Sequence, residues 1–253
     1  MPCALMIADP WFYLTAIIAV LIVGIAKGGL AGGIGIIGVP LMALTIGPIQ
    51  AAAIMLPILM LMDMLALRAY WRQWDTPNML IIIPGAVIGT VLGLLTFKYL
   101  TADHLRLLIG IIALGYAMNW FLSLGPKTAR PASRVRGTFW STVSGFTSFS
   151  VHAGGPPIHV YLLPQQLGKT RFQATTVAFF FLVNWFKLGP YAWLGLLDWS
   201  NLGMSLLLAP LAPVGIFLGT WLHRRIDERA FVMVVYVSLM AIGLKLIYDG
   251  WPF

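Results

Sequence analysis

The stretch from Gly24 to Leu44 reads GIAKGGLAGGIGIIGVPLMAL, and it decides how the chain must fold. It lies within apolar sequence long enough to sit in a bilayer, yet seven of its residues are glycine and Pro40 follows them. A glycine in a helix interior costs roughly 1 kcal/mol relative to alanine, so a plain membrane anchor gains nothing from this density. Lipid offers no partner to unpaired backbone N–H and C=O groups. We therefore expect a broken helix here, either walled in by protein or lining a wet cavity.

The composition places the whole chain in a membrane. Of its 253 residues, 60% are hydrophobic and only 9% are charged, against roughly 25% charged in an average soluble domain. The net charge of +8 comes from basic residues in short loops between apolar segments, which indicates membrane orientation and not nucleic-acid binding. Cys3 is the only cysteine, and no nucleotide loop, nucleophile triad or metal-ligand spacing is present. We expect no enzyme, no cofactor and no metal site.

Two apolar blocks are too long to be single crossings. Residues 11–45 would form a helix of roughly 50 Å, whereas the hydrocarbon core is about 30 Å thick. The block at 138–163 is also overlong and contains HAGGPP at 152–157. Full crossings are predicted at 50–67, 79–97, 105–122, 172–188, 202–222 and 231–247, with Gly189-Pro190 ending the one at 172–188. The fold class is therefore an all-α polytopic membrane protein.

The two halves of the chain repeat one another. Gly32-Gly33 aligns with Gly154-Gly155, and Pro84, Gly89 and Gly93 align with Pro210, Gly215 and Gly219, at spacings of 122 to 126 residues. Such self-similarity indicates one duplicated unit. The predicted organisation is a first transmembrane repeat at 1–122, a basic cytoplasmic linker at 123–137 and a second transmembrane repeat at 138–253.

Loop charge predicts the topology. The linker carries Lys127, Arg130, Arg134 and Arg136 with no acid, which favours the cytoplasmic side. The same count places loops 68–72, 164–171 and 223–229 inside and the C-terminus outside. Each overlong block must then start and finish on one side, as a broken or re-entrant helix pair. Three full crossings remain in each half, and because three is odd, the repeats have inverted topology.

The two glycine-rich breaks are the predicted substrate site. The N-terminus of a half-helix exposes backbone N–H groups and the positive end of the helix dipole, which together attract an anion. Glycines also allow the backbone to approach a ligand closely. The alternative is that these glycines form a small-residue packing face between helices.

Several polar side chains lie at membrane depth. Lys27 either holds an anion or extends its ammonium to the interface. Asp63 and Lys187 occupy the middle of equivalent spans, so they could pair directly, or Asp63 could pair with Lys27. Asn184 precedes Lys187 by three residues, on one helix face, which predicts an anion clamp or a structural interhelical contact. His152 could donate to an oxyanion, carry a coupled proton or serve as a structural donor.

These residues resemble a known family. The first stretch quoted above and the second, GFTSFSVHAGGPPIHVYLLPQQLGKTRFQATTVAFFFLVNWFKLGPYAWLGLL at 145–197, are similar to the repeat signatures of the TauE/SafE sulfite exporter family. The resemblance covers nearly the whole chain. It implies a bacterial inner-membrane carrier for sulfite, sulfonates, sulfoacetate or similar oxyanions, driven by ion gradients and not by ATP. The binding residues that it implies are Lys27, Gly28, Gly29, Gly32, Gly33, His152, Gly154, Gly155, Pro156, Pro157, Asn184 and Lys187.

The predicted function is therefore a secondary transporter, an exporter of small sulfur-containing or carboxylate oxyanions that works by alternating access. A passive anion channel using the same site is the alternative. The expected partners are a small anionic substrate, coupled protons or another ion, and the lipid bilayer. Asp63 and His152 are the candidates for coupling. The sequence is also compatible with a homo-oligomer.

Overall fold

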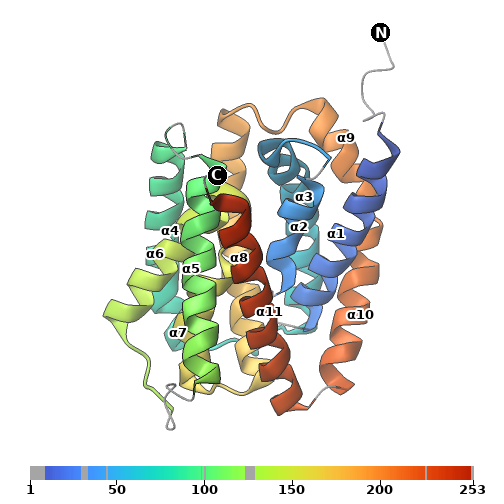
Figure 1. Cartoon of the computed structure of the whole chain (residues 1–253). Helices are drawn as coiled ribbons and strands as arrows, with labels where there is room; N and C mark the ends of the chain where they lie inside the picture. The colour runs from blue at the N-terminus through green and yellow to red at the C-terminus, as the bar shows by residue number, and fades with distance from the viewer. Residues whose placement is uncertain are drawn as a thin grey trace.

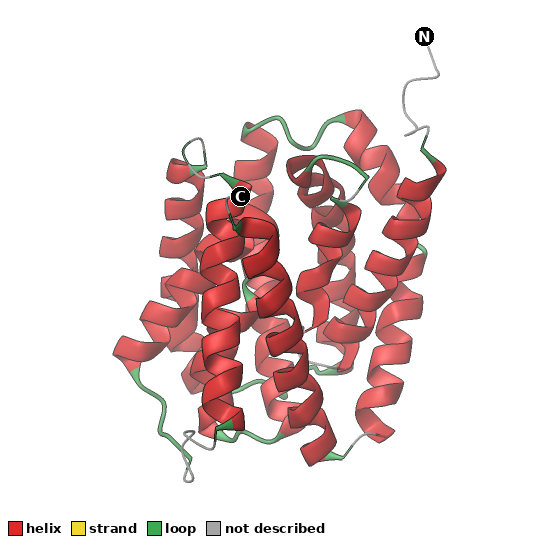
Figure 2. Ribbon diagram, in the orientation of Figure 1, coloured by secondary structure: helices red, strands yellow, loops and turns green. Residues whose placement is uncertain are grey.

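The computed structural model describes residues 9–29, 34–43, 45–97, 99, 101–122, 129–225 and 227–251. Within these ranges the regular elements are helices and no strand is present (Figure 2), which confirms the all-α prediction. In chain order they are α1 (Pro10–Gly29), the 3-10 helix η1 (Ile34–Ile37), α2 (Gly38–Met42), α3 (Pro48–Ala69), α4 (Thr76–Thr96), α5 (Ala102–Phe121), α6 (Arg134–Val151), α7 (Gly155–Leu162), the 3-10 helix η2 (Leu163–Gln165), α8 (Lys169–Trp193), α9 (Trp199–Leu208), α10 (Leu211–Arg225) and α11 (Glu228–Gly250). Figure 1 shows them as an upright bundle.

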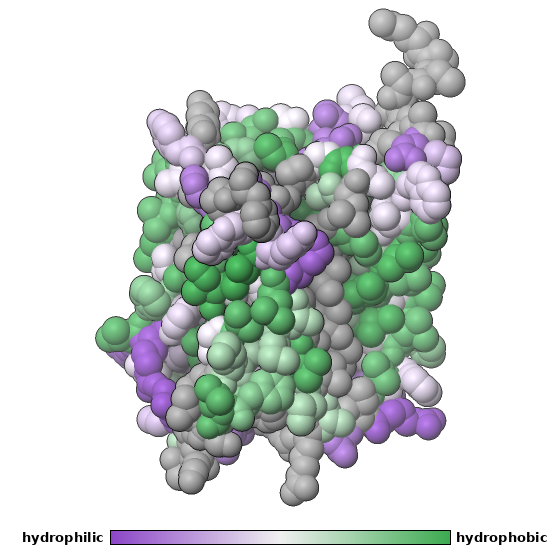
Figure 3. Space-filling view, viewed as in Figure 1, coloured by the Kyte–Doolittle hydropathy of each residue, from purple (hydrophilic) through white to green (hydrophobic). Residues whose placement is uncertain are grey.

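Several helices are built to cross a bilayer. Among the described residues, α1, the Ile49–Ala69 part of α3, and α4 are long and apolar enough for a span, and α9 with α10 makes a fourth if the bent pair is one crossing. Figure 3 shows hydrophobic residues over the middle of the visible face and hydrophilic residues along its lower edge. The chain is therefore a multi-pass membrane protein.

Two predicted spans have different boundaries in the structure. The prediction that Gly189-Pro190 ends a span was wrong, because α8 continues through Pro190 to Trp193. Membrane helices tolerate an interior proline where neighbouring groups satisfy the freed carbonyl. The predicted single span at 202–222 is instead two helices that bend by 45° at a break containing Pro210. Proline has no N–H to donate, so the helical hydrogen bonding is interrupted there.

Both overlong blocks double back. The start of α1 and the chain after α2 lie together, since the Thr15 and Thr45 hydroxyl oxygens are 3.2 Å apart. In the second block, the Arg130 N–H donates to the Pro164 carbonyl at 2.9 Å, so the chain before α6 meets the chain after α7. Each block is thus a long helix followed by a shorter returning arm. Helix α6 begins at Arg134, inside the predicted linker 123–137.

The basic residues gather at one end of the bundle. The chain after α3 meets the end of α10 there, because the Tyr70 and His223 rings pack edge to face at 5.5 Å. The start of α8 joins them through Lys169, whose ammonium donates to the His223 carbonyl at 3.1 Å. We call this the arginine-rich end, and its arginines are Arg68, Arg72, Arg130, Arg134, Arg136, Arg171, Arg224 and Arg225.

Glycines let helices from opposite halves of the chain pack backbone to backbone. A Cβ placed on Gly29 of α1 would lie 1.9 Å from the Gly219 carbonyl oxygen of α10. A Cβ on Gly89 of α4 would lie 2.0 Å from the Thr142 carbonyl oxygen of α6. Neither backbone could accommodate it without moving. Part of the glycine-rich pattern therefore serves helix packing, and the two halves interlock.

A substitution at one of these contacts should destabilise the fold. Gly89→Ala overpacks the α4–α6 contact, which costs about 1–3 kcal/mol, and should lower the thermal unfolding midpoint in detergent by roughly 2–10 °C. Gly115→Ala in α5 is the matched control, because no heavy atom lies within 4 Å of the added Cβ. Its midpoint should stay the same or rise slightly, since alanine is the better helix former. Equal midpoints for the two variants would contradict the packing argument.

Candidate functional site

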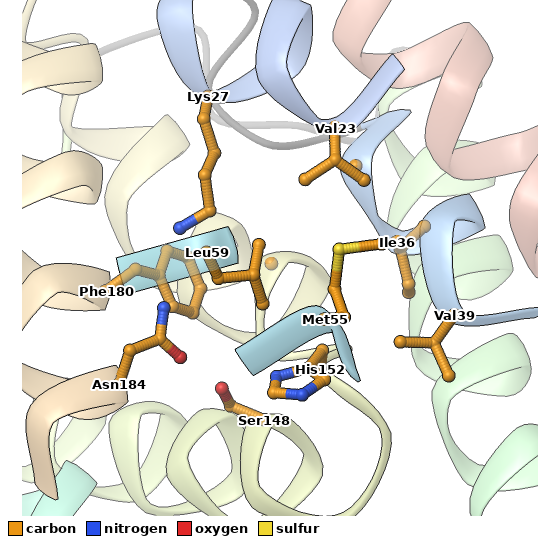
Figure 4. A pocket seen from close by; sticks show the side chains of 12 residues that line it. Val23, Lys27, Ile36, Val39, Met55, Leu59, Ser148, His152, Phe180 and Asn184 are labelled. Carbon is orange, nitrogen blue, oxygen red and sulfur yellow. The ribbon is translucent and has the colours of Figure 1, made fainter. Parts of the chain in front are cut away.

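A cavity of about 50 Å³ lies between the two halves of the chain (Figure 4). One water needs about 10–15 Å³ on this measure, so the cavity has room for about four waters or one small oxyanion. It is lined by Val23, Lys27, Gly35, Ile36, Val39, Met55, Leu59, Ser148, His152, Gly155, Phe180 and Asn184. Figure 4 shows Lys27 of α1, Asn184 of α8, and Ser148 and His152 from the end of α6 converging on this space.

Lys27 is held in the cavity by a buried ion pair. Its ammonium bonds to the carboxylate of Asp63 on α3, and the Asn184 amide of α8 donates to the other carboxylate oxygen at 2.6 Å. The Asp63 side chain is 1% exposed and the Lys27 side chain 12%. The Phe180 ring lies 5.7 Å from the Lys27 nitrogen. Of the pairings open to Asp63, the structure therefore contains the one with Lys27, and the ammonium does not extend to the interface.

Lys187 makes a different set of contacts. Its ammonium donates to the Ser148 carbonyl at 3.0 Å, to the Ser148 hydroxyl at 3.1 Å and to His152 Nδ1 at 2.7 Å. These three bonds use all of its N–H groups. The side chain is fully buried and does not line the cavity. Lys187 therefore acts on the cavity through Ser148 and His152, and no direct ion pair with Asp63 is formed.

His152 ends α6 in the left-handed conformation, with φ 54° and ψ 29°. Its Nε2 lies 2.9 Å from the Ala52 carbonyl of α3, which can only accept, so this nitrogen carries the hydrogen. Nδ1 is then the acceptor for Lys187. Both ring nitrogens have partners, so the imidazole is fixed in place as part of the cavity wall.

Three hydrogen-bond donors remain available to a ligand. The Ser148 hydroxyl accepts from Lys187, and its own hydrogen has no acceptor among the described residues. The Asn184 amide uses one hydrogen on Asp63 and keeps the other. At the start of α7, the Gly155 N–H likewise has no acceptor within the described ranges. Pro156 and Pro157 have no N–H, so the expected row of backbone donors at this break is reduced to the glycines.

The remaining predicted ligands lie elsewhere. Gly28 and Gly29 pack against α10, and their carbonyls contact Tyr70 and His223. The other residues of the second break, Gly154, Pro156 and Pro157, lie beside the cavity and do not line it. Gly32 and Gly33 lie outside the described residues.

Sequence reasoning missed Ser148 and Phe180. Ser148 lies one helical turn before His152, on the same face of α6, so its spacing could have revealed it. Phe180 precedes Asn184 by one turn on α8 in the same way. In the described chain, no group of His, Cys, Asp and Glu residues could hold a metal ion.

The buried charges do not balance. Two basic side chains, Lys27 and Lys187, lie here with one acidic side chain, Asp63, which pairs with Lys27, while the hydrogen-bonding pattern gives His152 a neutral ring. A surplus positive charge in a low-dielectric interior favours an anion in the adjoining cavity.

A comparison with protein-family models decides the identity. The model described as Sulfite exporter TauE/SafE matches residues 16–246. This chain belongs to the TauE/SafE family. Comparisons with curated proteins and with solved structures give no match. As a TauE/SafE protein the chain is a membrane transporter of a small anion, and the excess of basic over acidic side chains beside its cavity agrees with an anionic substrate.

The ion pair should contribute strongly to the stability of this TauE/SafE protein. Asp63→Asn would leave Lys27 buried without its counter-charge, which costs about 3–5 kcal/mol. We expect a large drop in the thermal unfolding midpoint in detergent. Asp249→Asn is the control, because its pair with Lys245 is an exposed contact within one helix, worth about 0.3–0.5 kcal/mol.

The double variant Lys27→Met/Asp63→Leu separates the ion pair from simple loss of packing. Removing one cation and one anion together leaves the net buried charge as it is in the parent, so most of the lost stability should return. If Asp63→Asn unfolds at the same temperature as Asp249→Asn, the buried pair does not have the role assigned to it.

Proposed function

We propose that this chain is a secondary transporter of the bacterial inner membrane that exports small sulfur-containing or carboxylate oxyanions, such as sulfite, sulfonates or sulfoacetate. The observation that carries the proposal is the excess of basic over acidic side chains beside the cavity, where Asp63 pairs with Lys27 and Lys187 bonds to Ser148 and His152 without a carboxylate partner. An oxyanion bound there would neutralise this surplus.

The anion is proposed to bind between Lys27, Ser148 and Asn184. Lys27 supplies charge, while the Ser148 hydroxyl and the free Asn184 hydrogen supply directed donors. Hydrogen bonds between ionised groups are about twice as strong as neutral ones, so Lys27 should dominate the affinity. Asp63 keeps the ammonium in position when the cavity is empty. In this proposal Gly155 is a backbone donor, Gly32 and Gly33 remain predicted ligands, and Gly28 and Gly29 serve helix packing.

Inverted repeats are the proposed basis for alternating access. Helix α4 in the first half and helix α9 in the second half are each capped at the N-terminus by an aspartate. Asp75 accepts from the Asn78 N–H at 3.0 Å, and Asp198 accepts from the Asn201 N–H at 2.8 Å. The packing of α1 on α10 also has a counterpart in the packing of α6 on α4. A cavity between such repeats can face either side when one repeat rocks against the other. The arginine-rich end is proposed to be cytoplasmic.

Transport assays test the site directly. In proteoliposomes, Lys27→Ala, Ser148→Ala and Asn184→Ala should each reduce uptake of radiolabelled sulfite. The expected loss is roughly 10- to 100-fold for Lys27, since a hydrogen bond to a charged group contributes about 1.5–3 kcal/mol. Lys245→Ala at the exposed end of α11 is the matched control and should transport like the parent.

Accumulation distinguishes the carrier from the passive channel. A secondary transporter should concentrate sulfite inside the vesicles when an ion gradient is imposed, and should exchange internal for external anion. A channel would only equilibrate sulfite and would pass current. Parent-like transport by all three site variants would show that the anion binds elsewhere.

A further inference from the structure

Two buried tyrosines make the same hydrogen bond in the two halves of the chain. The Tyr70 hydroxyl, just after α3, donates to the Gly28 carbonyl of α1 at 2.6 Å. The Tyr191 hydroxyl, near the end of α8, donates to the Phe149 carbonyl of α6 at 2.7 Å. Each tyrosine follows its acceptor by 42 residues. The second pair follows the first by 121 residues, so the two contacts occupy equivalent positions.

The same spacing of 121 residues relates the groups around the cavity. Lys27 and Ser148 are 121 residues apart in the sequence, and so are Asp63 and Asn184. The Asn184 amide donates a hydrogen bond to the Asp63 carboxylate at 2.6 Å. The same spacing also connects the first residues of α3 and α8. The cavity therefore lies where the two halves meet at equivalent positions, with one tyrosine contact belonging to each half.

Each tyrosine holds a helix end that carries a cavity residue. Gly28 directly follows Lys27, and Phe149 directly follows Ser148. The last four carbonyls of a helix have no partner within it, so both acceptors depend on outside donors. Tyr70 is 5% exposed and Tyr191 1%, so neither contact is replaced by bulk water. Breaking either hydrogen bond would free the helix end that positions a ligand of the cavity.

The two contacts lie on opposite sides of the cavity. Gln173 of α8 donates to the Lys27 carbonyl at 2.5 Å, next to the Tyr70 contact. Further along α8, Phe180 and Asn184 line the cavity, and Tyr191 follows. From Gln173 to Tyr191 the helix rises about 27 Å. The Tyr70 contact is at the arginine-rich end, and the Tyr191 contact is on the far side.

We propose that these two hydrogen bonds are the latches of the transport cycle, one for each side of the membrane. This inference rests on the proposed alternating-access function. Releasing Tyr70 separates α1 from α3 and opens the cavity toward the arginine-rich end. Releasing Tyr191 separates α6 from α8 and opens it toward the opposite end. The structure has both latches closed. A full cycle requires the two latches to open in turn, so that the cavity is never open to both sides.

Side-specific thiol labelling tests the latches without relying on transport. The reporter is Val39→Cys, which lines the cavity and is only 4% exposed, in a Cys3→Ser background. Oriented membrane vesicles are treated from either side with a membrane-impermeant methanethiosulfonate. Tyr70→Phe should speed labelling from the arginine-rich side alone, and Tyr191→Phe from the other side alone. Loss of one buried hydrogen bond predicts a change of about fivefold.

The controls fix sidedness and specificity. Val135→Cys and Trp199→Cys, which are 83% and 85% exposed, mark the arginine-rich and opposite sides respectively. Tyr13→Phe should leave labelling unchanged, since no hydrogen bond of its hydroxyl is found within the described residues. Phenylalanine keeps the ring and its packing, so the latch variants should fold.

The outcomes separate the latches from the transport function. Unchanged labelling in both tyrosine variants, or faster labelling from the same side in both, would overturn the latches even if sulfite transport is normal. If the tyrosine variants show side-specific labelling but the parent protein does not transport sulfite, the latches are supported and the proposed substrate is overturned.

Discussion

The structure depends on a charged group held inside an apolar bundle. The Lys27 ammonium is bonded to Asp63 and surrounded by helices from both halves, so α1, α3 and α8 must stay in register around it. Lys187 adds a second buried cation that binds Ser148 and His152 instead of a carboxylate. Burying these charges is unfavourable unless each has partners. The arrangement gives each of these groups a partner and sets two basic side chains against one acidic side chain, which makes the cavity suitable for an anion.

Glycine has two roles in this fold. Along α1 and α10, and along α4 and α6, it permits backbone contacts that no side chain would allow. At the second break, Gly155 begins α7 at the cavity wall, where the absence of a side chain leaves its N–H accessible. Close packing of the long helices and interruption of the short ones therefore use the same residue type. This explains why glycine density alone could not separate a packing face from a binding site.

The sequence was sufficient for the parts governed by hydrophobicity and chain length. It predicted an all-helical membrane fold and the two overlong blocks, and it selected Lys27 and Asn184, whose side chains line the cavity. It could not choose between partners for Asp63, because Lys27 and Lys187 are equally suitable by charge and only the three-dimensional packing selects one. It misplaced the helix breaks at Pro190 and Pro210, because the sequence does not show whether neighbouring groups let a membrane helix continue through a proline, as α8 does at Pro190. Ser148 was missed because it is one of several serines and threonines along α6, and only its spacing from His152 sets it apart.

The most direct test of the account is to locate the bound anion. Selenite has the shape and charge of sulfite, and its selenium gives an anomalous diffraction signal. Crystals of the parent protein soaked in selenite should show one site inside the cavity, with its oxygens within hydrogen-bonding distance of the Lys27 ammonium and the Ser148 hydroxyl. A cavity that stays empty while selenite occupies another site in a transport-competent protein would contradict the central claim that the surplus buried charge is there to receive the substrate.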